Sequence, residues 1–473
     1  MSNAHAELVE SVHGGSAAYR TEVESLLVAG WRYAGTYATS DGAMVRTLLA
    51  EPAGTTRLIS VATDGGHAPS IVDLVPAAGW DEREAADLHG LGFVGHSPLR
   101  PLVDHVEAGW TVPVGGDGPY QVAVGPIHAG IIESGHFRFH VVGDRILHLD
   151  ARLFYKHRGL ERAAEGQTLA DGMRYVSRAC AACAVSNGIA YAHACEQALG
   201  LTPTPGLART RTVLVELERT WNHLNDIAAV CAGAGLAAGN HRFAALTEQA
   251  RRLNADLTGH RFLFGAIRIG GSHLEADHTQ VLAIRDRLRA LRHQAATGWR
   301  ELVFNTSFQD RLHDVGVLSG EQVGRLGTVG PAARASGLAE DLRAHSPRLT
   351  YPAFESAVPE RATGDAKARL AQRALELWQS LALLDSLLDR PLTPTTAEPG
   401  AAQAGIGVGR VESPRGATSC IIERDGERLR RLHLRTGSYA NWPSVTHAAA
   451  GNLLPDFPLI NKSFELCYAC ADR

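Results

Sequence analysis

Two Cys-x-x-Cys pairs are the residues of this chain best suited to chemistry. Cys180 and Cys183 form the first pair, and Cys467 and Cys470 form the second. Four thiolates are enough to hold one soft metal centre. The pairs begin at positions 180 and 467, 287 residues apart, whereas a zinc ribbon closes a loop of roughly 15–20 residues. The spacing therefore predicts a buried site that forms only when a whole domain has folded.

Composition limits the partners and the compartment. The chain has 473 residues, 45% of them hydrophobic and 20% charged, with a formal net charge of −4. This balance predicts no nucleic-acid partner. We expect a cytoplasmic protein, because no signal peptide is recognisable and no stretch reaches the ~18 apolar residues of a membrane span. In a reducing compartment, the seven cysteines favour metal ligation over disulfides.

The cysteines must be positioned by the segments around them. The apolar patterns of these segments predict an α+β protein in two parts. The first part, residues 1–112, is expected to be a small α+β domain. Its apolar runs predict helices at 22–31 and from residue 80 onward, and strands at 43–50, 56–62 and 71–76. The glycine-rich residues 113–124 are predicted to be a linker.

The second part, residues 125–473, is expected to be a β-meander followed by a large, mainly helical domain. Residues 125–149 alternate and contain a Gly-Asp turn, which is typical of a meander. Cys180 and Cys183 precede a predicted helix over 184–200, whose dipole favours their thiolate forms. Long apolar-rich runs predict a helix bundle over residues 208–235, 242–264, 277–304 and 365–390.

The N-terminal part resembles the 30 kDa-type subunit of respiratory complex I. The resemblance implies a docking and assembly role without redox chemistry. It rests on ten positions that match that family's signature, namely Glu82, Arg83, Glu84, Asp87, Gly90, Phe93, Gly95, His96, Leu99 and Arg100.

The second part resembles the large-subunit superfamily shared by [NiFe]-hydrogenases and the 49 kDa-type subunit of complex I. The Gly125-Pro-Ile-His128 opening belongs to both branches, and residues 211–223, 316–320 and 330–343 look like the complex I branch. The 49 kDa subunits lack the two cysteine pairs, whereas this chain keeps all four thiols. It is therefore similar to group 4, energy-converting hydrogenases of the hydrogenase-4 and formate-hydrogenlyase type.

The resemblance implies a role for each matching residue. All four cysteines would ligate nickel in a Ni-Fe(CN)2CO centre, with Cys183 and Cys470 also bridging to iron. Glu133, 47 positions before Cys180, matches the glutamate that relays protons. Pro414 and Arg415 match the segment whose arginine lies over the metals and contacts the diatomic ligands of the iron.

Glu161 matches a glutamate that binds magnesium in many relatives. In those relatives the ion lies near a C-terminal histidine, but this chain has Arg473 there. A direct ion pair between Glu161 and Arg473 and a magnesium site are therefore both open. Two further departures concern the tuning of the centre, because Glu465 replaces an aspartate and Asn187 replaces a histidine.

Together these features predict the catalytic large subunit of a membrane-associated [NiFe]-hydrogenase. The expected partners are a small subunit with a [4Fe-4S] cluster, complex I/antiporter-like membrane subunits and maturation proteins. These partners would hold the chain peripherally on the inner face of the cell membrane. Two alternatives stay open: a complex I-like, quinone-binding subunit with vestigial cysteines, and an assembly protein that uses the thiolates for zinc.

Overall fold

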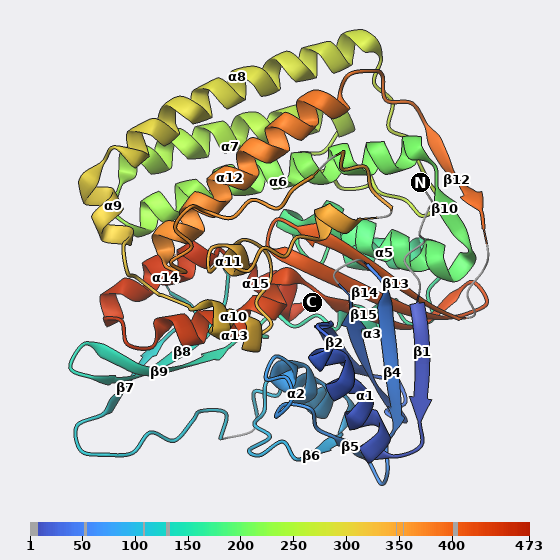
Figure 1. Cartoon of the computed structure of the whole chain (residues 1–473), viewed down its shortest axis with the longest axis vertical. Coiled ribbons are helices and arrows are strands. Elements are labelled where there is room, and N and C mark those ends of the chain that lie inside the picture. The colour runs from blue at the N-terminus through green and yellow to red at the C-terminus, as the bar shows by residue number, and fades with distance from the viewer. Residues whose placement is uncertain are drawn as a thin grey trace.

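The protein consists of an N-terminal sheet with two helices, a central three-stranded sheet and a layer of long helices (Figure 1). The predicted α+β class is confirmed. The computed structural model describes residues 8–51, 54–106, 109–128, 133–346, 348–352, 354–400 and 405–473.

A four-stranded sheet in the order β1-β4-β3-β2 forms the N-terminal part. Its strands are β1 (Leu8–His13), β2 (Arg32–Ala38), β3 (Met44–Ala50) and β4 (Thr56–Ala62). β1 runs parallel to β4, and the other neighbours are antiparallel. Alternate apolar residues on one face pack against α1 (Ser16–Val28) and α2 (Ala78–His89). The helix predicted from residue 80 and the strands at 43–50 and 56–62 are confirmed.

The strand predicted at residues 71–76 is wrong. The backbone turns there, and the N–H groups of Leu74 and Val75 donate to the carbonyl of Ile71. Ile71 and Val75 are both buried, whereas Asp73 between them is exposed. A strand would place all three side chains on one face, so this burial pattern does not fit a strand.

The predicted meander is present, and its last two strands, β8 (His136–Val142) and β9 (Arg145–Arg152), lie in the predicted range and are connected by Gly143-Asp144. Its first strand, β7 (Tyr120–Val124), lies within residues 113–124, which were predicted to be a linker. The linker prediction is therefore wrong for residues 120–124, which pair with β8. The predicted helix bundle is also confirmed, with α6 (Pro205–Gly233), α7 (Ala237–Thr258), α8 (His278–Val303) and α12 (Ala366–Leu387). α6 is buried along almost its whole length, between its neighbours α7 and α12.

The central sheet, in the order β13-β14-β15, joins the two parts of the chain. Its strands are β13 (Ile406–Ser413), β14 (Gly416–Asp425) and β15 (Arg428–Arg435). Ile406 and Val408 pack against the N-terminal sheet in a shared core. Gly407 and Gly409 point the other way, where a Cβ would collide with the backbone of α5 (Ala184–Leu199). The Ile-Gly-Val-Gly alternation therefore lets one strand pack on a sheet and a helix at once.

Shorter elements complete the fold. Helices α3 (Leu160–Ala164) and α4 (Leu169–Ser177) precede the first cysteine pair, and α13 (Gly437–Ala449), α14 (Phe457–Phe464) and α15 (Tyr468–Asp472) surround the second. The rest are β5 (His67–Pro69), β6 (Gly92–Val94), β10 (Leu201–Pro203), β11 (Gly271–Ser272), β12 (Thr395–Pro399), α9 (Thr306–Leu312), α10 (Gly320–Arg325) and α11 (Gly330–Arg334). Among the described residues, no helix is both long and apolar enough to cross a bilayer.

Candidate metal centre

The first cysteine pair lies at the start of α5. Cys180 precedes a short 3-10 turn, Ala181–Cys183, and Cys183 is the N-cap residue of the helix. The first N–H groups of an α-helix have no partner within the helix. Here Glu218 of α6 accepts hydrogen bonds from the N–H groups of Val185 and Ser186 at 2.6 and 3.0 Å. α6 therefore fixes the direction in which α5 and its cysteines enter the core.

The second pair follows a sharp change of chain direction. α14 ends at Glu465, whose φ of 47° is left-handed. Cys467 is then the N-cap residue of α15, and its N–H donates to the Ser438 hydroxyl at 3.0 Å. At the other end of α15, the Asp472 carboxylate accepts the N–H groups of Phe154 and Lys156. These contacts hold the last helix in the interior.

The two pairs meet as predicted from their chemistry. The sulfur atoms of Cys180, Cys183, Cys467 and Cys470 all lie within 4.8 Å of one another, so they could hold one metal ion. Cys467 is partly exposed and the other three are buried. Thiol hydrogen bonds from those three, together with the positive charge of Arg415, hold the pKa of Cys467 well below its usual range. The cluster therefore presents at least one thiolate to a soft metal.

Arg415 lies beside this cluster on the turn between β13 and β14. Its guanidinium donates two hydrogen bonds to Asp226, at 2.5 and 2.8 Å. Burial lowers the pKa of Arg415, but the charges of Asp226, Cys467 and Cys183 hold it well above the usual value. The Arg415 side chain is a permanent cation next to the sulfurs, and its two hydrogen bonds to Asp226 hold it in place.

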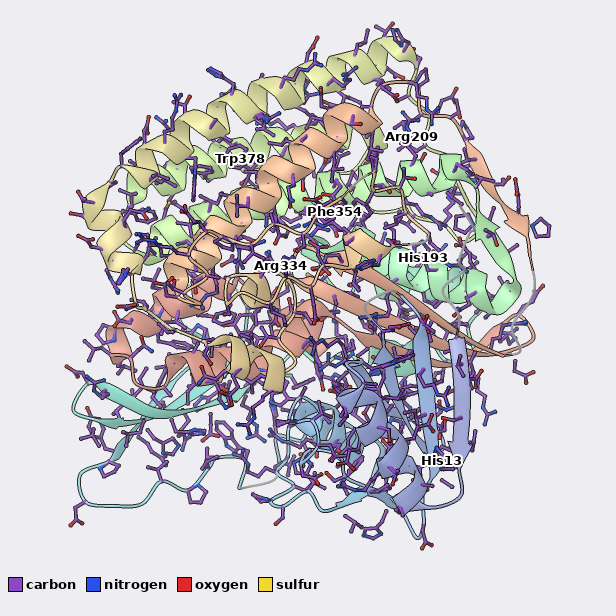
Figure 2. The ribbon with its side chains drawn as sticks, viewed as in Figure 1. His13, His193, Arg209, Arg334, Phe354 and Trp378 are labelled. Carbon is purple, nitrogen blue, oxygen red and sulfur yellow. The ribbon has the colours of Figure 1, made fainter. Side chains whose placement is uncertain are left out.

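A buried chain of charged groups holds Asp226 in turn. Asp226 lies 3.5 Å from Nδ1 of His223, whose Nε2 lies 3.1 Å from Glu376. Glu376 pairs at 2.8 Å with Arg334, whose position Figure 2 labels. Burial raises the pKa of Asp226, but the charge of Arg415, together with His223 and the charge of Arg373, keeps that pKa below its ordinary value. Asp226 is therefore a fixed anion.

Glu133 approaches the cluster from the loop before β8. Its carboxylate accepts the N–H of Ala469 at 2.7 Å. Burial, with the negative charge of Cys467 next in effect, raises the pKa of Glu133 to about 7. A carboxyl with this pKa exchanges its proton near neutral pH.

Glu161 makes an ion pair with the last residue of the sequence. Nε of Arg473 donates to it at 2.6 Å, and another guanidinium nitrogen of Arg473 donates to Glu84 of α2 at 2.6 Å. Glu161, Glu84 and His433 have donor atoms close enough to share a cation. In this structure the Arg473 guanidinium makes the contacts to both carboxylates.

Comparisons with known proteins agree with this geometry. The family models for the 30 Kd and 49 Kd subunits of respiratory-chain NADH dehydrogenase match residues 32–121, 242–398 and 395–473. Formate hydrogenlyase subunit 5 of Escherichia coli (strain K12) is 30% identical over 86% of this chain and 77% of its own length. Hydrogenase-4 component G of the same organism is 30% identical over 87% and 77%.

The chain belongs to the family of membrane-bound hydrogenase large subunits that is related to complex I. It is accordingly an oxidoreductase by family. Relatives of the complex I branch are also similar, such as an NADH-quinone oxidoreductase subunit of Solibacter usitatus (strain Ellin6076), at 28% identity over 70% of this chain and 91% of that protein. A chain from the solved membrane-bound sulfane sulfur reductase, an archaeal respiratory membrane complex, superposes with a TM-score of 0.70. It is 26% identical, and the match covers 76% of this chain and all of that one.

Two buried polar groups test whether a metal centre with ligands of its own fits at the cysteine cluster. Asn187 lies one helical turn after Cys183, and both ends of its amide are buried without a partner among the described residues. Nε of Arg415 is likewise buried without a partner there. Buried polar groups are normally hydrogen-bonded. The unpaired donors of Asn187 and Arg415 fit a metal group that carries its own hydrogen-bond acceptors. A zinc ion held by the four sulfurs alone would offer these donors no acceptor.

The polar face of α6 was not predicted from the sequence. Glu218, Asn222 and Asp226 recur every fourth residue on a helix that is otherwise buried, and each supports the centre. The signal was present, because three polar side chains on one face of a core helix require partners. Which partners they have depends on contacts distant in sequence.

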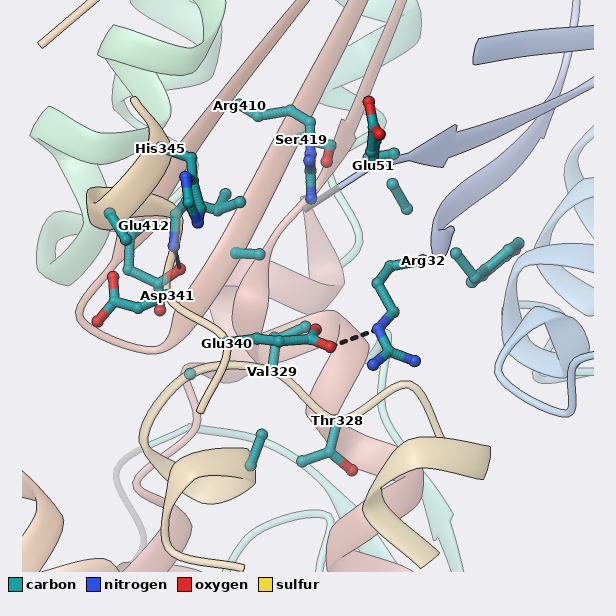
Figure 3. Close-up of a pocket in the computed structure, with 18 of the residues that line it drawn as sticks. Arg32, Glu51, Thr328, Val329, Glu340, Asp341, His345, Arg410, Glu412 and Ser419 are labelled. Carbon is teal, nitrogen blue, oxygen red and sulfur yellow. Dashed lines mark hydrogen bonds and ion pairs between the residues drawn. The ribbon is translucent and has the colours of Figure 1, made fainter. Parts of the chain in front are cut away.

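A cavity of about 200 Å³ lies behind the Arg415 turn, between the N-terminal sheet and residues 328–345 (Figure 3). An ion pair between Arg32 and Glu340 lies at its edge. Gly330 lines the cavity and touches the Arg415–Gly416 backbone so closely that a Cβ would lie 2.4 Å from the Gly416 Cα. The turn that carries Arg415 is thus supported from behind by residues at the boundary with the N-terminal sheet.

Proposed function

We propose that this chain is the catalytic large subunit of a [NiFe]-hydrogenase. The observation that carries the proposal is the convergence of four cysteine sulfurs with Arg415 and Glu133 beside them. A site that only holds zinc for stability needs neither a fixed cation nor a carboxyl that titrates near pH 7. A nickel–iron centre with CN and CO ligands, when bound, would supply the reversible cleavage of H2 into two protons and two electrons.

Each of these residues would have its own role in the reaction. Cys180 and Cys467 would hold nickel, and Cys183 and Cys470 would hold both metals, because thiolates are soft ligands able to bridge. Arg415 would place its guanidinium, and Pro414 its backbone, against the diatomic ligands. Glu133 would pass protons between the cluster and solvent. The two electrons would go to a [4Fe-4S] cluster in a small subunit, because no further set of cysteines is available in this chain.

The proposed assembly rests on the family resemblance and on relatives that are subunits of membrane-bound complexes. We place this chain on the inner face of the membrane, held by a small subunit and by complex I/antiporter-like membrane subunits after maturation proteins have loaded the metal. At Glu161, the hydrogen bond from Arg473 supports an ion pair. A magnesium ion at Glu161 is implied by the family resemblance and stays a prediction.

Metal analysis of the purified complex tests the proposal. We expect about one nickel per chain and infrared bands of cyanide and carbon monoxide. Cys467→Ser should lose nickel, whereas Cys195→Ala should keep it, because Cys195 is a buried thiol outside the cluster. If the complex contains no nickel and shows no such bands although maturation factors were present, the hydrogenase proposal is wrong.

A second candidate is a complex I-like, quinone-binding subunit. The matches to the 30 Kd and 49 Kd family models favour it. In that case the cysteines would be vestigial, the purified complex would contain no nickel, and a quinone would bind near Glu133. A stoichiometric zinc ion without infrared bands would instead indicate an assembly protein.

A further inference from the structure

A larger cavity, of about 420 Å³, lies on another boundary between the two parts of the chain. Its walls come from α2, residues 96–100, β9, α10 and α13 (Figure 1). Its volume falls in the range of sites for small organic ligands, roughly 300–1,000 Å³. No residue of the candidate metal centre lines it.

The charges that line this cavity are mainly positive. Arg83, Arg100 and Arg325 come from three different segments, and Asp150 is the one carboxylate among the described residues of the lining. Asp150 already pairs with Arg100 at 3.1 Å and with two histidines. Positive charge is therefore in excess before any histidine is protonated.

Arg83 is a half-buried cation on the lining of this cavity. Its guanidinium donates to the carbonyls of Arg100 and Pro101, at 2.7 and 2.8 Å, and has no carboxylate partner in the part of the chain that the structure describes. Burial, and then the charge of Arg100, lower the pKa of Arg83 to about 10. Burying an unpaired cation costs free energy, which a bound anion would offset.

Arg325 supplies an accessible third guanidinium. It is the last residue of α10, it is exposed, and it makes no ion pair among the residues described. Three guanidiniums suit a group with three terminal oxygens and nearly two negative charges, since a carboxylate has only two oxygens to offer.

The other walls are apolar. Trp80, Leu326 and Pro443 line the same cavity. A free phosphate ion would leave most of this space and the indole face of Trp80 without contact. An ester with an organic part would fill it.

We propose that this cavity binds a phosphate monoester, with its phosphate on Arg83, Arg100 and Arg325 and its organic part against Trp80. The chemistry fits either a soluble nucleotide-type ester or the headgroup of an anionic lipid. The proposal is independent of hydrogenase activity.

Calorimetry at low ionic strength tests the site on the full-length protein, with inorganic phosphate and AMP as probes. Flotation with phosphatidylcholine vesicles containing phosphatidic acid tests the lipid source. Arg325→Glu should weaken whichever probe binds by at least about tenfold, because it replaces attraction by repulsion. The matched control is Arg292→Glu, another exposed helical arginine without an ion pair among the described residues, and it should bind like the wild type.

The outcomes separate the possibilities. AMP binding that is lost in Arg325→Glu assigns a soluble ester, and vesicle binding alone that is lost in the same variant assigns a lipid headgroup. No binding of phosphate, AMP or vesicles overturns the proposal. Equal loss of binding in Arg325→Glu and Arg292→Glu also overturns it, because the effect would then be general surface charge.

Discussion

Glu133 is the residue at which protonation can be tested most directly. Its pKa of about 7 lets it give and take a proton at equal cost near neutral pH, which is the condition for an efficient relay. We expect Glu133→Gln to slow exchange of H2 with solvent deuterium by roughly 10²–10⁴-fold while nickel content stays unchanged. The control is Glu301→Gln on the exposed face of α8. Exchange at the wild-type rate in Glu133→Gln would exclude the relay.

The same shift predicts how stability depends on pH. The folded protein keeps the Glu133 proton up to about pH 7, whereas the ordinary carboxyl loses it near 4.5. The folded state therefore binds more protons between these values, so its stability falls as pH rises through this window. The side chain of Glu133→Gln cannot ionise, so its unfolding free energy should increase relative to that of the wild type as pH rises from 4.5 to 7. Urea unfolding at several pH values would measure this difference.

At the scale of single elements, α6 organises the centre. Its polar side chains recur every fourth residue, so one face holds both the start of α5, through Glu218, and Arg415, through Asp226. Because the helix is rigid and buried, it fixes the spacing between the first cysteine pair and the arginine. The turn that carries Arg415 is held by Ser413, whose hydroxyl donates to the Gly416 carbonyl and accepts the Arg415 N–H, and by the elements packed behind it.

The support behind that turn can be tested at Gly330. Its φ is +69°, and an added Cβ would lie 2.4 Å from the Gly416 Cα and 2.7 Å from the Arg415 carbonyl oxygen. Gly330→Ala should therefore displace the turn, destabilise the protein by roughly 1–3 kcal/mol and lower nickel content. Urea unfolding and metal analysis measure both effects. Gly324→Ala, within α10 and where a Cβ has open space, should leave nickel content unchanged and stabilise the protein by at most about 1 kcal/mol.

At the scale of the whole molecule, local patterns and long-range contacts were not equally predictable. Each Cys-x-x-Cys pair is a local signal, and the chemistry of a four-thiolate site predicted that the two distant pairs would meet. Local apolar periodicity predicted the four long helices. The shared core of Ile406 and Val408 with the N-terminal sheet, and the pairing of Asp226 with Arg415, could not be predicted. Each joins segments more than 180 residues apart, and a single sequence carries no record of such contacts.

Arg473 connects the two parts of the molecule close to the cysteine cluster. It follows the second cysteine pair by three positions and is buried between Glu84 of the N-terminal part and Glu161 of the second part. Its guanidinium also lies over the Tyr439 ring, 4.6 Å from the centroid. Removing one partner of a buried charge cluster leaves the others uncompensated, which typically costs about 3–5 kcal/mol.

We therefore expect Arg473→Gln to destabilise the protein by several kcal/mol and to loosen α15, so that nickel is lost together with stability. Glu84→Gln in the same background should restore part of the stability, because it removes one of the two unpaired carboxylates. Arg430→Gln removes an exposed arginine whose contact to Asp41 spans 3.7 Å, and it should change stability by less than about 0.5 kcal/mol. Denaturant unfolding and metal analysis of the four proteins decide the matter. Unchanged nickel content in Arg473→Gln would show that the other contacts of α15, such as those of Asp472, Ser438 and Glu133, hold it without Arg473.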